Sequence, residues 1–225
     1  MRNFICCIIS ILWFSAAAQD IGTVFYTLNS DNLRWIDATS RKSLIAKYKE
    51  SGADSIQNVF GDWIRLEVYD ETNHFLRIKT SDAGSIELKM FPTGKGHFIT
   101  GLCFTACAPI CDSHITFFDE HQNLIESELF SRNTIADFID IDTLTATEKS
   151  KKKKSEMTNR FVEKLTIIFN ELHFAQNENK ITLTHDFESY LDKDLYKELK
   201  PYLKGNSMDF VWDNNIFNPQ NTYWK

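Results

Sequence analysis

An alternation of apolar and polar side chains with a period of two runs through the middle of the chain. Ile64, Leu66 and Val68 are separated by charged residues, and the same period recurs over residues 76–78 and 86–90. Successive side chains of a β-strand point to opposite faces of a sheet, so this period predicts strands with one buried and one solvated face.

The connections between these strands are short and rich in turn-forming residues. They are D-E-T-N, S-D-A-G and P-T-G-K-G, at residues 70–73, 81–84 and 92–96. Connections of this length join only antiparallel neighbours, because a parallel pair needs a crossover of a dozen or more residues. Two more apolar runs, at residues 97–107 and 112–119, extend the pattern to an antiparallel five-stranded meander.

Helical signals flank the meander. A short turn is expected near residues 30–35, followed by a helix that is capped by Thr39 or Ser40 and stops at Gly52. After the meander we expect a helix, a strand, a helix and a strand. Their signals are the helical spacing of Phe161, Leu165, Ile168 and Leu172, then residues 180–184, 189–203 and 208–212. This order of elements predicts an α+β fold.

The N-terminal residues have the form of a secretory signal peptide. Arg2 precedes an apolar run over residues 5–14, and three alanines end at Ala18. An uncleaved anchor and a buried helix are the alternatives, but the run is shorter than the roughly 20 residues of a bilayer span. Gln19, where a lipoprotein signal would have cysteine, argues against lipidation. We therefore expect residues 1–18 to be cleaved after Ala18 and the protein to be exported to the periplasm.

The expected mature chain, residues 19–225, is predicted to be one exported α+β domain without a membrane span. A subdivision into residues 19–125 and 155–217, joined by a linker at residues 126–154, is the alternative organisation. Eighteen phenylalanines favour a packed core. The formal net charge of −6 disfavours nucleic acid as a partner, since phosphate binding depends on clustered Lys and Arg. The lysine run at residues 151–154 is interpreted as a solvated part of the linker.

Three cysteines lie four residues apart in G-L-C-F-T-A-C-A-P-I-C-D-S, at Cys103, Cys107 and Cys111. If A-P-I forms a hairpin loop, the last two face each other on paired strands, within the distance that a disulfide spans. A Cys107–Cys111 disulfide is therefore predicted, with Cys103 as a small core residue. Reduced, buried cysteines and a zinc site are the alternatives, and the extended geometry disfavours zinc because its ligands must converge.

The string T-A-C-A-P-I-C-D-S-H-I-T-F-F-D, at residues 105–119, resembles a family of exported Gram-negative bacterial proteins catalogued as domain of unknown function 3256. The matching positions are Thr105, Pro109, Asp112, Ser113, Ile115 and Phe117, while Phe118 replaces the usual tyrosine. Residues 181–203 are similar to the family's C-terminal strand and helix. The resemblance implies a signal peptide and an α+β domain, and it brings no activity, cofactor or catalytic residue.

No catalytic or metal motif stands out in the sequence. Ser113 beside Asp112 has no identifiable base, and the histidines are scattered. Three aspartates could contribute oxygen ligands to calcium, but the hydrophobic residues between them favour packing; they are Asp137, Asp140 and Asp142. We therefore predict no catalytic residue, no metal and no cofactor.

These observations favour a non-catalytic binding or structural module of the cell envelope. Its partner would be an envelope protein or a glycan. The aromatic residues between Phe210 and Trp224 are either core or an exposed contact surface. The alternative function is a hydrolase whose site is assembled from distant segments, because catalytic sites depend on geometry rather than on order along the chain.

Overall fold

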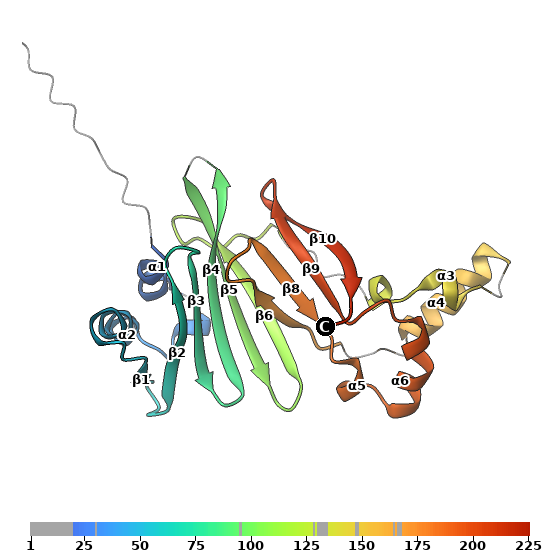
Figure 1. Ribbon diagram of the computed structural model, residues 1–225, viewed down its shortest axis with the longest axis horizontal. Helices are drawn as coiled ribbons and strands as arrows, with labels where there is room; N and C mark the ends of the chain where they lie inside the picture. The colour runs from blue at the N-terminus through green and yellow to red at the C-terminus, as the bar shows by residue number, and fades with distance from the viewer. Residues whose placement is uncertain are drawn as a thin grey trace, which may run out of the picture.

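The chain forms two antiparallel sheets that lie side by side, with helices at both ends (Figure 1). The computed structural model describes residues 20–225 except residues 30, 95, 128, 130–134, 147–148, 164 and 166–167. The predicted signal peptide and its cleavage site lie outside the described residues. Within that part of the chain, no helix is long and apolar enough to span a bilayer.

The first sheet has six strands in sequence order, each antiparallel to the next. They are β1 (Ser55–Gln57), β2 (Trp63–Asp70), β3 (Phe75–Ser81), β4 (Gly84–Gly94), β5 (His97–Cys107) and β6 (Cys111–Phe118). The predicted α+β class and antiparallel sheet are confirmed. The prediction of five strands is wrong, because β1 pairs with β2 and is too short to show a period of its own.

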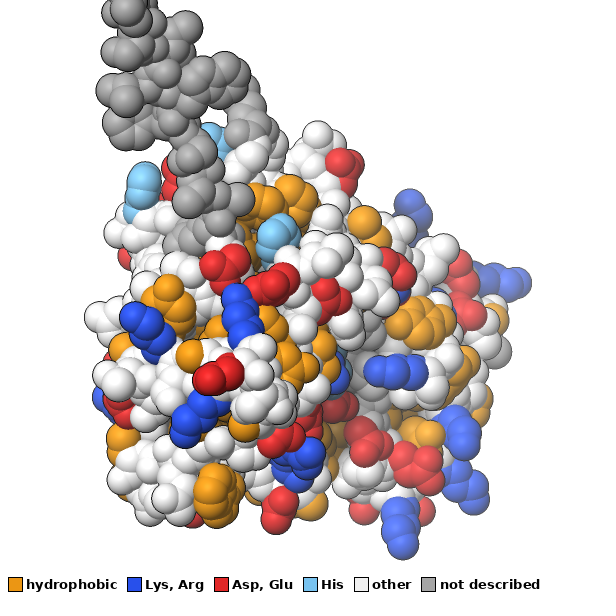
Figure 2. Space-filling view, turned by 60° about the vertical axis from the view of Figure 1, so that its left-hand side comes forward, with side chains coloured by type: hydrophobic (Ala, Val, Ile, Leu, Met, Phe, Trp, Pro, Cys, Tyr) orange, Lys and Arg blue, Asp and Glu red, His pale blue; other side chains and the backbone are white. Residues whose placement is uncertain are grey.

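One face of this sheet is covered by α1 (Ile21–Thr27), η1 (Asp31–Leu33) and α2 (Ala38–Ser51). The predicted second helix is present and ends at Gly52 with a φ of 70°, but its cap is Asp37, whose carboxylate accepts from Ser40 N–H. The buried guanidinium of Arg41 donates to the carbonyls of Phe25 and Leu28 at 2.6 and 2.8 Å. Arg41 therefore fixes the end of α1 against α2. Figure 2 shows this side of the molecule, where side chains of both charges are interspersed.

The second sheet has four strands in the order β10-β9-β8-β7. They are β7 (Glu171–Phe174), β8 (Lys180–Thr184), β9 (Ser207–Asp213) and β10 (Ile216–Tyr223). The helices of this half are η2 (Ile135–Phe138), α3 (Ile141–Leu144), α4 (Lys151–Glu163), α5 (Phe187–Tyr190), α6 (Lys193–Leu199) and η3 (Lys200–Tyr202).

Two predictions for this half are wrong. The helix expected to include Leu172 ends at Glu163, and Leu172 lies in β7. The lysine run at residues 151–154 begins α4 instead of forming a linker. The final residues form edge strand β10, where Pro219 is tolerated because an edge position can lack a ladder donor.

Aromatic rings join the two sheets in one core. The ring centroid of Phe91 on β4 lies 5.5 Å from the ring centroid of Phe174 and 4.9 Å from that of Phe217. Trp212 is nearly buried and donates its indole N–H to the carbonyl of Pro92 at 2.7 Å. The aromatic C-terminal segment thus supplies core residues through β9 and the start of β10.

Side chains of the first sheet hold the outer edge of β7. The N–H of Leu172 donates to Ser113 Oγ at 3.0 Å, and the N–H of Phe174 donates to Glu87 Oε2 at 2.7 Å. The thiol of Cys103 donates to the Leu172 carbonyl at 3.3 Å. Backbone groups at a buried strand edge need partners, and here the face of β4, β5 and β6 supplies them.

Candidate binding groove

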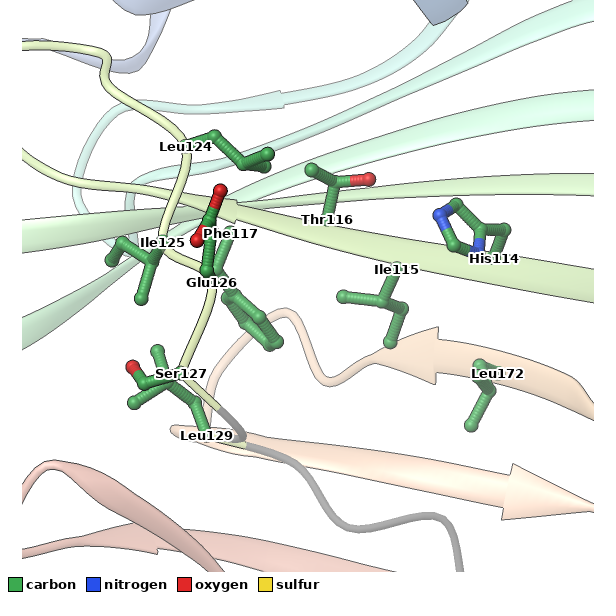
Figure 3. A pocket seen from close by; sticks show the side chains of 10 residues that line it. All are labelled: His114, Ile115, Thr116, Phe117, Leu124, Ile125, Glu126, Ser127, Leu129 and Leu172. Atoms are coloured by element: carbon green, nitrogen blue, oxygen red, sulfur yellow. The ribbon is translucent and has the colours of Figure 1, made fainter.

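A groove of about 490 Å³ lies beside β6, the last strand of the first sheet (Figure 3). We call it the edge groove. Its walls come from β6, from the segment that follows β6, and from β7. The lining residues are His114, Ile115, Thr116, Phe117, Leu124, Ile125, Glu126, Ser127, Leu129 and Leu172.

The two faces of β6 give the edge groove two different sides. Phe117 packs beneath the strand against the ring of Phe217 in the second sheet, at 5.5 Å, and Ile115 packs against the same core. Thr116 and His114 project from the opposite face of the strand, because neighbouring strand residues alternate (Figure 3). Leu124 is 57% exposed at the rim. The edge groove therefore offers an apolar wall with polar groups along its opening.

The chain's own backbone occupies both ends of the β6 edge. Near the start of the strand, Ser113 N–H donates to the carbonyl of Asn170 at 2.8 Å. Near its end, Ile125 N–H donates to the carbonyl of Phe117 at 2.9 Å. Ile115 lies between these two contacts, in the middle of the groove.

The predicted disulfide lies at the tip of the β5–β6 hairpin, outside the edge groove. Cys107 and Cys111 are bonded, with Cα atoms 3.9 Å apart, and the two residues are paired in the strand register. Cys103 is buried, as predicted, and contacts β7 through its thiol. The cysteines therefore close the hairpin and brace the junction between the sheets.

An apolar hollow of about 350 Å³ lies near that hairpin tip. Its walls include Trp35, Phe104 and Phe60, and Phe60 is 78% exposed on the loop between β1 and β2. Trp63, at the start of β2, is also largely exposed. This loop is a second apolar surface, separate from the edge groove.

The candidate nucleophile Ser113 has a structural role. Its hydroxyl lies 2.8 Å from that of Thr105 and accepts the N–H of Leu172. The Asp112 carboxylate accepts from Asn170 N–H at 3.0 Å. The sequence pair therefore serves to position β7.

A buried acid–base network lies at the junction of the two sheets. Glu87 is 2% exposed, and its carboxylate contacts Arg77 at 2.7 Å and His173 Nδ1 at 2.8 Å. The other ring nitrogen of His173 lies 3.1 Å from Glu171. Bonds to Glu171 and Glu87 raise the pKa of His173 to about 9. Both ring nitrogens are thus committed to carboxylates, so this histidine is a structural imidazolium.

Lys89 is a second charged group at the same junction. Its ammonium donates to the carbonyls of Asn73 and Gln176, at 3.2 and 2.9 Å, and burial lowers its pKa to about 8. Nearby, hydrogen bonds from Asn73 and Gln176 lower the pKa of Asp70 to about 2. These polar contacts bind the β7–β8 turn to the first sheet.

A cavity of about 360 Å³ brings distant segments together near His185. Burial lowers the pKa of His185, and its Nδ1 lies 3.0 Å from the carbonyl of Phe169. The other lining residues are Asp186, Phe187, Glu188, Tyr196, Lys200, Asn206, Trp224 and Lys225. This set contains no serine, threonine or cysteine, and its one hydroxyl is the phenol of Tyr196.

Two of the other candidate ligands, Asp140 and His97, have local partners. The Asp140 carboxylate caps α3 by accepting from the N–H and hydroxyl of Thr143, at 3.0 and 2.7 Å. His97 pairs with Glu120 at the surface. Among the described residues, no three His, Cys, Asp or Glu side chains are grouped so as to hold a metal ion.

The edge groove was not predicted from the sequence. Residues 124–129 fall where the alternation loosens, and no pattern indicates that they return alongside β6. The only available signal was the match of Ile115 and Phe117 to the strand of a known family.

Comparison with known proteins identifies relatives of unknown function. A family model described as "Protein of unknown function (DUF3256)" matches residues 13–217. No protein with a curated description matches the chain. A solved structure, "Structure of a domain of an uncharacterized protein from Porphyromonas gingivalis W83", is 15% identical. It has a TM-score of 0.70, and the match covers 90% of this chain and 98% of that one, which shows a shared fold.

Proposed function

The chain belongs to the DUF3256 family of proteins of unknown function, and on that premise we propose that it is a non-catalytic binding module of the cell envelope. In this proposal the edge groove is its contact site. The signal-like N-terminus, with cleavage after Ala18, delivers the protein to the periplasm.

The main observation in support of this contact site is an apolar recess at the edge of the first sheet. Leu124 is more than half exposed at its rim, and Leu129 and Leu172 line its depth. Recesses that combine an apolar lining with a few polar groups are common binding sites. The exposed groups at the opening, His114 and Glu126, supply polarity that orients a partner.

The acid–base groups of the sheet junction support a binding role over a catalytic one. A general base must have an atom available to take a proton from the substrate. His173 has both nitrogens bonded to carboxylates, and Glu87 is bonded to Arg77, His173 and the backbone of Phe174. These groups stabilise the junction between the sheets.

Site-specific photocrosslinking tests the contact site. A photoreactive residue at Leu124, in the cells that produce the protein, should yield a defined adduct, and one at exposed Val211 should yield none. Ser127→Trp fills the groove from an exposed position and should lower the Leu124 adduct at least tenfold. An adduct from a photoreactive residue at Phe60, without one at Leu124, would contradict the proposal. It would show that the partner contacts the loop between β1 and β2 instead of the edge groove.

Export is tested separately by the N-terminus of the protein in its native cells. The periplasmic fraction should contain a chain that begins at Gln19. A full-length chain confined to the cytoplasm would contradict export and leave the groove experiment unaffected.

A further inference from the structure

We infer that the partner bound in the edge groove is an extended polypeptide segment that adds to β6 as a further strand. This inference rests on the proposed function and names the chemical class of the partner. It follows from the backbone of β6 rather than from its side chains.

The register of the first sheet determines which backbone groups of β6 face outward. In an antiparallel pair, both backbone groups of every second residue point away from the partner strand. Ser113 and Phe117 point away from β5, because Ser113 N–H bonds Asn170 and the Phe117 carbonyl bonds Ile125. Ile115 shares their parity, so its N–H and C=O also point outward.

Three of these outward groups have no backbone partner within the described part of the chain: the N–H and C=O of Ile115 and the N–H of Phe117. The segment that follows β6 leaves the strand after Ile125, and its lining residues lie beside Phe117 rather than beside Ile115 (Figure 3). As far as the described residues show, the middle of the edge therefore lies open within the groove.

A row of outward donors and acceptors at strand spacing matches the backbone of another strand. Strand addition satisfies such groups, whereas a lipid or an apolar small molecule would bury them without partners. The chain already uses this edge in the same way, through Asn170 at one end and Ile125 at the other. From Ser113 to Phe117 the edge spans about 13 Å, at about 3.3 Å per residue. The open stretch therefore accommodates about three residues of a partner.

The two sides of the edge groove determine which types of side chain the bound segment should carry. Alternate residues of an added strand point to opposite faces. One position meets the apolar wall of Ile115, Leu129 and Leu172, and its neighbours meet His114, Thr116 and the rim. We expect an apolar residue flanked by polar ones. Proline is excluded wherever the partner's N–H faces β6.

The test uses phage displaying random linear heptapeptides, selected on the purified protein. Ile115→Pro removes an outward N–H without removing a bond to β5, and Ile115→Val keeps that N–H as the matched control. Selected peptides should bind Ile115→Val like the wild type and Ile115→Pro at least tenfold more weakly. In the wild type, bound peptide should slow hydrogen exchange of the Ile115 amide; this measurement decides the matter if Ile115→Pro fails to fold.

The outcomes separate this inference from the proposed function. Leu124→Arg changes the exposed rim and leaves the backbone of β6 in place. Peptides that lose binding to Leu124→Arg but keep it to Ile115→Pro, without protecting the Ile115 amide, would refute strand addition and retain the groove as the contact site. A selection that enriches no peptide also refutes strand addition, while the Leu124 crosslink tests the groove independently.

Discussion

The carboxylate of Glu87 on β4 accepts the backbone N–H of Phe174 on β7 at 2.7 Å, across the junction of the two sheets. Its other oxygen contacts Arg77 and His173. One buried side chain thus satisfies a strand edge and balances two cations. This arrangement makes Glu87 the residue whose charge matters most to the junction.

Glu87→Gln should lower the free energy of unfolding by about 3 kcal/mol, because removing one partner of a buried ion pair leaves uncompensated charge. The amide keeps the size of the side chain and an oxygen for the Phe174 N–H. Glu67→Gln, at an exposed position of β2, is the matched control and should change stability by less than about 0.5 kcal/mol. Urea unfolding measures the free energy of unfolding of each variant. Equal losses in the two variants would contradict a stabilising role for the Glu87 ion pairs.

His173 should stabilise the protein in a pH-dependent way. Its folded pKa of about 9 lies above the ordinary value of 6.5. A raised pKa means that the folded state binds the proton more tightly, so the stabilisation is complete below about pH 6.5 and is lost as the pH rises through about 9. The stability difference between wild type and His173→Gln should therefore shrink over this range.

Urea unfolding at several pH values between 6 and 10 measures that difference. Lys89 titrates in the opposite sense, since burial lowers its pKa to about 8, but it is present in both proteins and cancels in the comparison. A difference that stays constant from pH 6 to 10 would contradict the charged role of His173.

Gly101→Ala should destabilise the protein by about 1–3 kcal/mol through overpacking. A Cβ at this position on β5 would lie 2.7 Å from the ring of Phe174 and 3.2 Å from those of Phe117 and Phe91. Combining it with Phe174→Leu should recover part of the loss, because the smaller side chain makes room. A double-mutant cycle from urea unfolding measures the coupling, and strictly additive effects would contradict direct crowding.

Thiol titration of residues 19–225, denatured and unreduced, should find one thiol, from Cys103. Cys107 and Cys111 are bonded to each other and cannot react. The same sample after reduction should give three thiols. Three thiols before reduction would contradict the disulfide.

Sequence reasoning predicted the elements whose pattern is local. The alternation at Ile64, Leu66 and Val68 and the short turns led to an antiparallel sheet, because period and connection length are both visible in the sequence. Hairpin geometry likewise led to the pairing of Cys107 with Cys111. Both inferences needed only neighbouring strands.

The features that sequence reasoning missed depend on contacts between distant segments. Leu172 fits the spacing of the preceding apolar residues, so a helix was expected where β7 forms. The strand exists because Ser113, Cys103 and Glu87 supply partners to its outer edge, and these residues lie far away in the sequence. The edge groove depends on the same long-range placement, since Leu172 forms one of its walls.

The strictly sequential order of β1 to β6 has a consequence for how the chain acquires its structure. Every pairing in the first sheet closes a short loop, and contacts between near neighbours form faster than distant ones. The first sheet can therefore assemble from residues 55–118 before the rest of the chain is available. We expect Glu87, Cys103 and Ser113 then to be in place when β7 forms against them, so that the N-terminal half directs the folding of the C-terminal half.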